Sequence, residues 1–291
     1  MFETILTPVD GSPEGEGAIA HAVALARIAD GTIHALSVIH PEDDLVNVDE
    51  QQRDAVHRYT EQLGRQAIGT VTDVADDADV DVVETLREGV VYREIVGYAD
   101  ESDVDLIVMG TRGQTARSRL GSTAERTLAY APVPVVTVRT SDAVTDVDDV
   151  SIDRIVIPTD GSDAAERAAA VALEFAAFVD ASVDVVYVVD RTISDLEDAP
   201  RSIIGLLEEG GNAAVQAIEA EANDLGITVR TGIRRGTPTD ELLAYADRVD
   251  ADLLAMGTRG HGETDDRLLG STTVRVLRAA ERPVLTVNAS R

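Results

Sequence analysis

The stretch MGTRGHGETDDRLLGST, residues 256–272, decides how this chain is organised. It lies between a short apolar run and an arginine-rich segment of helical periodicity, and it contains Gly257, Gly260 and Gly270. Glycine has no Cβ, so it can adopt positive φ and turn its N–H toward an anion. Ser271 stands where a helix is expected to begin, beside free N–H groups and the positive end of the helix dipole. The stretch therefore predicts a phosphate-binding loop.

A second copy of the motif favours this interpretation over a plain loop. The lysine of the GxxxxGK[ST] motif is missing, and an ordinary strand-to-helix connection with Ser271 as the N-cap would use the same residue types. However, residues 109–123 read MGTRGQTARSRLGST, so MGTRG and GST recur. Farther upstream, ILTPVDGS at 5–12 matches IVIPTDGS at 155–162. The chain is predicted to be a tandem duplication.

These motifs resemble the universal stress protein family in its tandem form. The resemblance rests on PVDGS at 8–12 and PTDGS at 158–162, each after the first expected strand of its half, together with the two glycine loops. Strict alternation of strands and helices predicts an α/β fold with a parallel sheet. The resemblance implies two Rossmann-like domains, similar to adenine nucleotide alpha hydrolases, each with strand order 3-2-1-4-5 and helices on both faces. Domains are expected at 1–140 and 153–291, and the polar, acidic segment 141–152 is expected to link them.

The resemblance also implies a nucleotide site in each half, because a parallel sheet binds ligands beyond the carboxyl ends of its strands. In the second half the family pattern falls on Pro158, Thr159 and Asp160, on Val188 and Val189 near the adenine, and on Gly257, Gly260, Gly270, Ser271 and Thr272 for the phosphates. In the first half it falls on Pro8, Val9, Asp10, Val38, Ile39, Gly110, Gly113, Gly121, Ser122 and Thr123.

The expected cofactor is ATP, with ADP or AMP as alternatives, together with Mg²⁺. Asp160 is the candidate metal contact, since a carboxylate at a strand end can meet a ribose hydroxyl or a magnesium ion that bridges phosphates. The alternative is that Asp10 and Asp160 cap the helices that follow them. Arg112 and Arg259 are expected to be solvated rather than to contact phosphate.

The two glycine loops differ in length. Nine residues separate Gly260 from Gly270, whereas seven separate Gly113 from Gly121. Two residues shorten an extended arm by about 7 Å. The second half is therefore expected to bind ATP, and the first to bind it weakly or not at all.

Composition excludes several classes of function. The formal net charge is −29, from 54 Asp plus Glu against 25 basic residues, all of them arginine because lysine does not occur. Such a surface repels nucleic acid and anionic membranes, so neither is an expected partner. It indicates a protein adapted to molar salt, from a source such as a halophilic archaeon. Cysteine is absent, which excludes thiol catalysis, disulfides and thiolate metal sites.

The chain is expected to be cytoplasmic. It has no stretch of about eighteen apolar residues, and its N-terminus, MFETILTPVDGS, is a strand and a turn rather than a signal peptide. The apolar fifth strands of the two halves, at 133–138 and 283–287, are expected to pair and form a pseudo-dimer; a homodimer of the whole chain is left open.

The favoured function is a stress-response module that binds nucleotide and acts as a sensor or regulator. The loops offer only His261, Glu263, Asp265 and Asp266 for hydrolysis, and this acidic run beside phosphates argues against fast chemistry. Two alternatives remain. One is a slow ATP-hydrolysing enzyme of the adenine nucleotide alpha hydrolase type, and the other is a scaffold without ligand.

Overall fold

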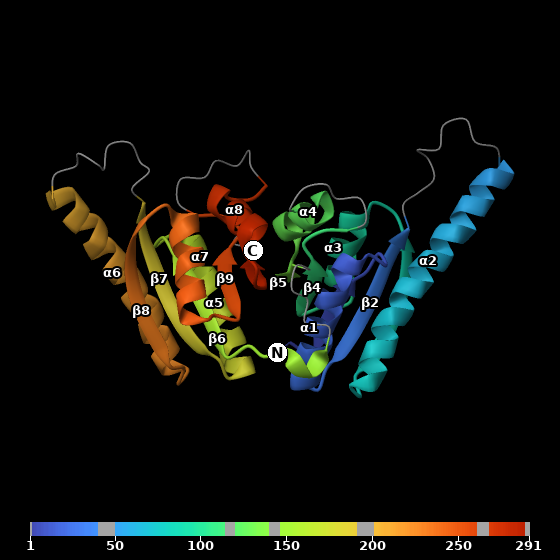
Figure 1. Ribbon diagram of the computed structural model, residues 1–291, viewed down its shortest axis with the longest axis horizontal. Helices are drawn as coiled ribbons and strands as arrows, with labels where there is room; N and C mark the ends of the chain where they lie inside the picture. Colours follow the sequence, from blue (N-terminus) through green and yellow to red (C-terminus); the bar gives the residue numbers. More distant parts are fainter. Residues whose placement is uncertain are drawn as a thin grey trace. The chain divides into compact units, whose positions relative to one another are not determined.

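The computed structural model describes residues 2–39, 50–113, 120–139, 146–190, 201–260 and 268–288. The chain forms two compact units, Met1–Val150 and Ser151–Arg291 (Figure 1).

The first unit alternates strands with helices, as the sequence pattern predicts. Its elements are β1 (Thr4–Pro8), α1 (Pro13–Ala29), β2 (Thr32–Ile39), α2 (Glu50–Asp77), β3 (Asp81–Glu88), α3 (Val91–Glu101), β4 (Leu106–Gly110), α4 (Ser122–Tyr130), β5 (Val135–Val138) and the 3-10 turn η3 (Val147–Asp149).

The second unit repeats this order. Its elements are β6 (Arg154–Thr159), α5 (Asp163–Val179), β7 (Ser182–Asp190), α6 (Arg201–Asp224), β8 (Val229–Gly236), α7 (Pro238–Val249), β9 (Leu253–Gly257), α8 (Ser271–Ala279) and β10 (Val284–Val287).

Each unit has a five-stranded parallel sheet. The strands lie in the order β3-β2-β1-β4-β5 in the first unit and β8-β7-β6-β9-β10 in the second. In both units the first strand pairs with the second on one side and with the fourth on the other. This is the predicted order 3-2-1-4-5. The break between the first and fourth strands is the switch point, where adjacent crossovers leave in opposite directions and open a crevice.

Four helices cover each sheet in two pairs. In the first unit α1 packs against α2 and α3 against α4, and in the second α5 packs against α6 and α7 against α8. Right-handed crossovers require this arrangement, because the chain reverses its direction across the sheet after the third strand. The central strands are covered on both faces, and all five residues of β9 are buried. None of the described helices is both long and apolar enough to cross a bilayer.

Aspartate ends several helices in a conformation usually left to glycine. Asp30, Asp180 and Asp250 follow α1, α5 and α7 with φ of 51°, 59° and 54°. Asparagine and aspartate tolerate this left-handed region better than other residues with a Cβ. These three aspartates of the acidic composition therefore end helices.

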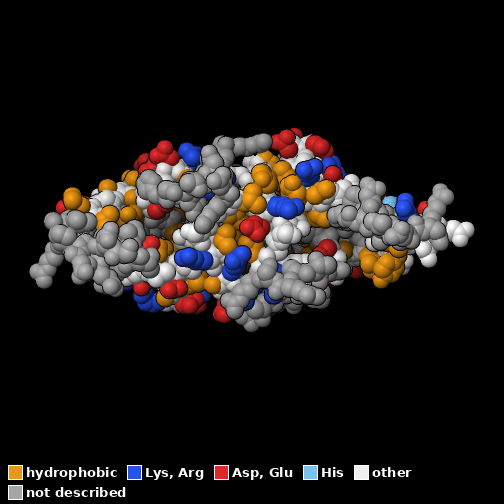
Figure 2. All heavy atoms as spheres, turned by 90° about the horizontal axis from the view of Figure 1, so that it is seen from above, with side chains coloured by type: hydrophobic (Ala, Val, Ile, Leu, Met, Phe, Trp, Pro, Cys, Tyr) orange, Lys and Arg blue, Asp and Glu red, His pale blue; other side chains and the backbone are white. Residues whose placement is uncertain are grey.

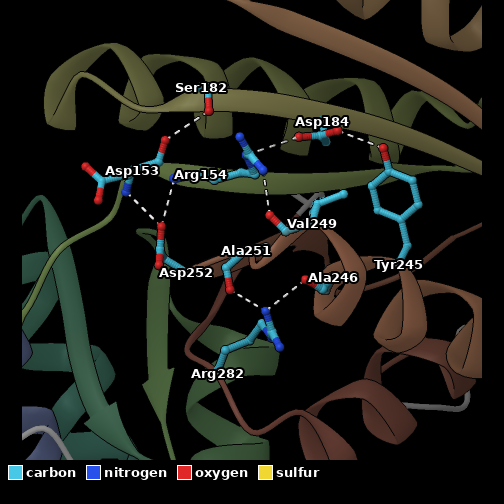
Figure 3. A network of polar contacts seen from close by, with 10 residues as sticks. All are labelled: Asp153, Arg154, Ser182, Asp184, Tyr245, Ala246, Val249, Ala251, Asp252 and Arg282. Atoms are coloured by element: carbon cyan, nitrogen blue, oxygen red, sulfur yellow. Dashed lines mark hydrogen bonds and ion pairs between the residues drawn. The ribbon is translucent and has the colours of Figure 1, made fainter.

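The end of the second sheet at which its strands begin contains a polar network (Figure 3). Asp252 Oδ2 accepts the backbone N–H groups of Asp153 and Arg154, each at 2.9 Å. The Arg154 guanidinium donates to the Val249 carbonyl at 2.6 Å and lies 3.7 Å from the buried Asp184 carboxylate. The Tyr245 hydroxyl donates to Asp184 at 2.7 Å. This network lies at the end of the sheet opposite the expected ligand crevice, so its role is structural.

Candidate functional site

The first strand of each unit ends in a tight turn that the aspartate stabilises. Gly11 and Gly161 have φ of 71° and 74°, where a Cβ would be strained. In the first unit Asp10 Oδ1 accepts the Ser12 N–H at 3.0 Å, and Asp160 Oδ1 accepts the Ser162 N–H at the same distance. The N-caps of α1 and α5 are Ser12 and Ser162, so each aspartate stabilises the turn before the helix rather than capping the helix itself.

The second oxygen of each aspartate faces the glycine loop. A Cβ built on Gly113 would lie well inside van der Waals contact with Asp10 Oδ2, and one on Gly260 would meet Asp160 Oδ2 in the same way. Glycine is needed here because the loop approaches the carboxylate closely. The predicted reason, positive φ, is wrong for these two glycines; Gly121 and Gly270 also have ordinary φ, −75° and −63°.

The far ends of the two loops are anchored alike. The Gly121 N–H donates to the Thr111 carbonyl and the Gly270 N–H donates to the Thr258 carbonyl, each at 2.8 Å. These two glycines are the N-caps of α4 and α8, so the alternative with Ser271 as the N-cap is wrong. Neither glycine has a side chain to cap its helix, so no N-cap side chain bonds the first-turn N–H groups.

The difference in loop length therefore does not displace the start of either helix. In each loop the last glycine bonds the carbonyl of the threonine that directly follows the fourth strand of its unit, Thr111 or Thr258. The two extra residues of the second loop lie between these two bonded positions in the chain and do not change them. Residues 114–119 and 261–267, which include His261, Glu263, Asp265 and Asp266, lie outside the described residues.

A cavity of about 390 Å³ opens at the switch point of the first unit. Strands β1, β2 and β4, helix α3 and the first turns of α1 and α4 supply its lining. Nine of the ten residues expected for this half lie on it, namely Pro8, Val9, Asp10, Val38, Gly110, Gly113, Gly121, Ser122 and Thr123. The tenth, Ile39, is only 7% exposed and is not among the lining residues.

The cavity is also lined by residues that were not among the predicted ligand contacts. They are Ser12, Gly15, Leu36, Val91, Ile95, Met109, Arg112 and Ala124. Val91 and Ile95 stand four residues apart on α3, so helical periodicity places them on one face of the helix, but nothing in the sequence indicates that they contact a ligand. Arg112, which was expected to be solvated, is half-buried: it lines the cavity, and its Nε is buried without a hydrogen-bond partner among the described residues.

Comparison with known proteins agrees with this architecture. The universal stress protein family model matches residues 1–139 and 151–288. The chain belongs to the universal stress protein family. A universal stress protein of Methanocaldococcus jannaschii is 38% identical over 139 residues, which are 46% of this chain and 81% of that protein. One from Mycolicibacterium smegmatis is 28% identical over 299 residues, covering 97% of this chain and 96% of its own.

A solved structure shares the fold over the whole length of this universal stress protein. The crystal structure of a universal stress protein from Archaeoglobus fulgidus matches it with a TM-score of 0.71 at 23% identity, covering 98% of this chain and 96% of the other. The likeness supports the tandem α/β architecture.

The second unit of this universal stress protein places equivalent residues at the same positions. Pro158 and Thr159 end β6, Val188 and Val189 lie in β7, and Gly257 ends β9. Ser271 and Thr272 begin α8, and the neighbouring Thr273 donates to the Gly257 carbonyl at 3.0 Å. In the first unit Ala124 replaces this threonine and lines the cavity.

Tyr187 packs against α6, where a Cβ on Gly211 would clash with its ring. Burial raises the pKa of the Tyr187 hydroxyl, and the negative charge of Asp160 raises it further. The tyrosine therefore remains neutral at physiological pH. Its counterpart in the first unit is Ser37.

A metal ion would find few protein ligands here. Within the described ranges no three His, Asp or Glu side chains form a group suited to a metal. Asp160 Oδ1 already accepts two hydrogen bonds, from the Ser162 N–H at 3.0 Å and the Ser162 hydroxyl at 2.6 Å. Magnesium is commonly held by one or two carboxylates together with substrate phosphates, and only that mode fits a single aspartate.

Proposed function

We propose that this universal stress protein binds ATP at the crevice of each unit and acts as a regulatory module in the stress response. The observation that supports this most is the cavity of the first unit. Its volume of about 390 Å³ lies within the range of about 300–1,000 Å³ usual for small-molecule sites. The motif residues of β1, β2, β4 and α4 converge on it from separate parts of the sequence.

The chemistry of the lining supports a nucleotide with its phosphates at α4. The N-terminus of α4 begins at the cavity with Ser122 and Thr123, and Gly121 leaves its first-turn N–H groups uncapped. Helix N-termini attract phosphate through these donors and through the helix dipole. Arg112 adds a cation to the same cavity. The apolar side chains of Leu36 and Val38 give a surface suited to a base.

In the second unit we propose the equivalent set: Pro158, Thr159, Asp160, Val188, Val189, Gly257, Gly260, Gly270, Ser271 and Thr272. Magnesium would accompany the phosphates, with Asp160 as its candidate contact from the protein. The ion would neutralise phosphate charge beside this carboxylate.

The first test is to identify and titrate the ligand. Mass spectrometry of small molecules carried by the purified chain should detect an adenine nucleotide, and calorimetry should give saturable ATP binding in molar KCl.

Gly113→Ala should lower ATP binding at the first site by more than tenfold, and Gly260→Ala should do so at the second, because each new Cβ displaces an aspartate. Gly69→Ala is the matched control, since a Cβ there meets nothing within 4 Å. A chain that binds no adenine nucleotide would refute the proposal.

The stoichiometry tests whether the two sites are unequal. The sequence-based expectation is one strong site per chain, in the second unit, lost in Gly270→Val and kept in Gly121→Val. The shorter first loop was the reason to expect this inequality. Because both loops are anchored alike, the shorter loop does not move the start of α4. Any difference in affinity must therefore come from side chains or from the loop interiors. Two equal sites would contradict the expectation.

Binding without rapid turnover is the proposed activity. The described lining of the first cavity contains one carboxylate, Asp10, and its Oδ1 is already committed to the Ser12 N–H. A slow hydrolase is the second candidate, and a phosphate-release assay with the Gly113→Ala and Gly260→Ala double variant as the blank would detect it.

A further inference from the structure

The two units use the serine after DG in different ways. In the second unit the Ser162 hydroxyl donates to Asp160 Oδ1 at 2.6 Å and accepts the Ala165 N–H at 3.1 Å, so it caps α5. In the first unit Ser12 is only 5% exposed, and its hydroxyl has no hydrogen-bond partner among the described residues. Ser12 nevertheless lines the cavity.

A buried hydroxyl without a partner is unfavourable, and such groups are rare in folded proteins. The sequence difference beside it leaves room for a ligand: Gly15 replaces Ala165, and a Cβ on Gly15 would lie 3.9 Å from Ser12 Oγ. Gly15 also lines the cavity. The unused hydroxyl therefore faces a space in which a ligand atom can satisfy it.

We propose that Ser12 Oγ hydrogen-bonds a ribose hydroxyl of the nucleotide in the first unit, an assignment that rests on the proposed function. The neighbouring charge selects this chemistry. The Asp10 carboxylate is tied to the Ser12 N–H at 3.0 Å, so a negative group lies beside the hydroxyl and disfavours phosphate there. A sugar hydroxyl both donates and accepts, so it can serve a carboxylate and a serine together.

The consequence is that the two sites discriminate differently among nucleotides. The first unit recognises the ribose through a hydroxyl that the second unit uses to cap its own helix. Loss of Ser12 Oγ should therefore weaken ATP binding, but it should not weaken binding of the analogue that lacks the contacted ribose hydroxyl.

The experiment compares ATP, 2′-deoxy-ATP and 3′-deoxy-ATP by calorimetry, in a Gly260→Ala background that confines binding to the first unit. Ser12→Ala should lower ATP affinity about fivefold, the size of one neutral hydrogen bond. For one of the two deoxy analogues it should lower affinity less than about twofold. Ser12→Thr, which keeps a hydroxyl, should retain the preference for ATP.

The matched control is Ser162→Ala in a Gly113→Ala background, where any loss should be equal for all three nucleotides. Ser12→Ala should leave the melting temperature nearly unchanged, because Ser12 makes no side-chain cap, whereas Ser162→Ala should lower it. Equal losses for ATP and both analogues, or no loss with ATP, would overturn the Ser12 assignment. Absence of ATP binding in the unmodified chain would instead refute the proposed function.

Discussion

At the scale of single residues, a duplicated motif has acquired different interactions in its two copies. Ser12 and Ser162 occupy equivalent positions, but only the second hydroxyl caps its helix. His34 and Asp184 are also equivalent. His34 Nδ1 lies 2.9 Å from the Tyr98 hydroxyl, whereas Asp184 accepts a hydrogen bond from Tyr245 and raises the pKa of that tyrosine, with burial as the larger cause, to about 12. Sequence similarity between the halves therefore does not imply equal chemistry.

His21 should make the stability of the fold depend on pH. It is buried in α1, and burial lowers its pKa, although Nδ1 lies 2.8 Å from the Gly17 carbonyl and partly offsets this. The unfolded chain, with an ordinary histidine pKa near 6.5, then binds more protons than the folded chain below that pH. The free energy of unfolding should fall as pH drops through about 6.5, by less than about 1.4 kcal/mol per unit from this residue.

Denaturant unfolding at pH 7.5 and 5.5 in molar KCl measures this loss. His21→Gln should show a smaller loss than the unmodified chain, and His57→Gln, at a half-buried position of α2, is the control that should leave the loss unchanged. An identical pH dependence with and without His21 would contradict the assignment.

At the scale of elements, aspartate ends several of the helices. Asp180 follows α5 with φ of 59° and ψ of 37°, and its N–H donates to the Ala176 carbonyl. Glycine adopts this conformation without strain, although it loses more backbone entropy on folding. Asp180→Gly should raise the free energy of unfolding by about 0.5 kcal/mol.

The matched change is Asp163→Gly at the other end of α5, where the carboxylate interacts favourably with the helix dipole. It should lower stability by about 1 kcal/mol. Thermal melts of both variants would decide the point, and destabilisation by both would show that Asp180 makes a side-chain contribution that glycine cannot replace.

At the scale of the whole molecule, charge should govern stability. With a net charge of −29 the folded chain repels itself, and molar salt shortens the Debye length to about 3 Å. Figure 2 looks onto the side where the strands end and shows acidic and basic side chains near one another there. We expect the melting temperature to rise from dilute buffer to molar KCl, and a flat curve would contradict the halophilic interpretation.

The pairing of the two units stays a prediction. Their fifth strands, β5 and β10, are short, apolar and last in each sheet, and unpaired apolar edges favour aggregation. Because the chain has no cysteine, pairs introduced along the two strands, such as Thr137→Cys with Thr286→Cys, can report proximity. At least one register should form an intramolecular disulfide. Failure of every register would contradict a pseudo-dimer through these strands.

The amino-acid sequence by itself determined the architecture. Duplicated motifs identified two similar halves, and the alternation of apolar runs with helical periodicity predicted the parallel sheet, because these patterns depend on local geometry and burial. The strand order 3-2-1-4-5 was implied by the resemblance to the family. Nine of the ten residues predicted for the first half line the first cavity, since strand ends and glycine loops are local features.

Only the tertiary structure decided which distant groups meet and which remain unused. The approach of Gly113 to Asp10, the common anchoring of loops of unequal length, the walls supplied by Val91 and Ile95, and the unpartnered hydroxyl of Ser12 all depend on contacts between separate elements. The residues Asp-Gly-Ser are identical in the two turns, so the sequence cannot show whether the serine hydroxyl caps a helix or faces a cavity. That choice depends on neighbours that fold into place from elsewhere in the chain.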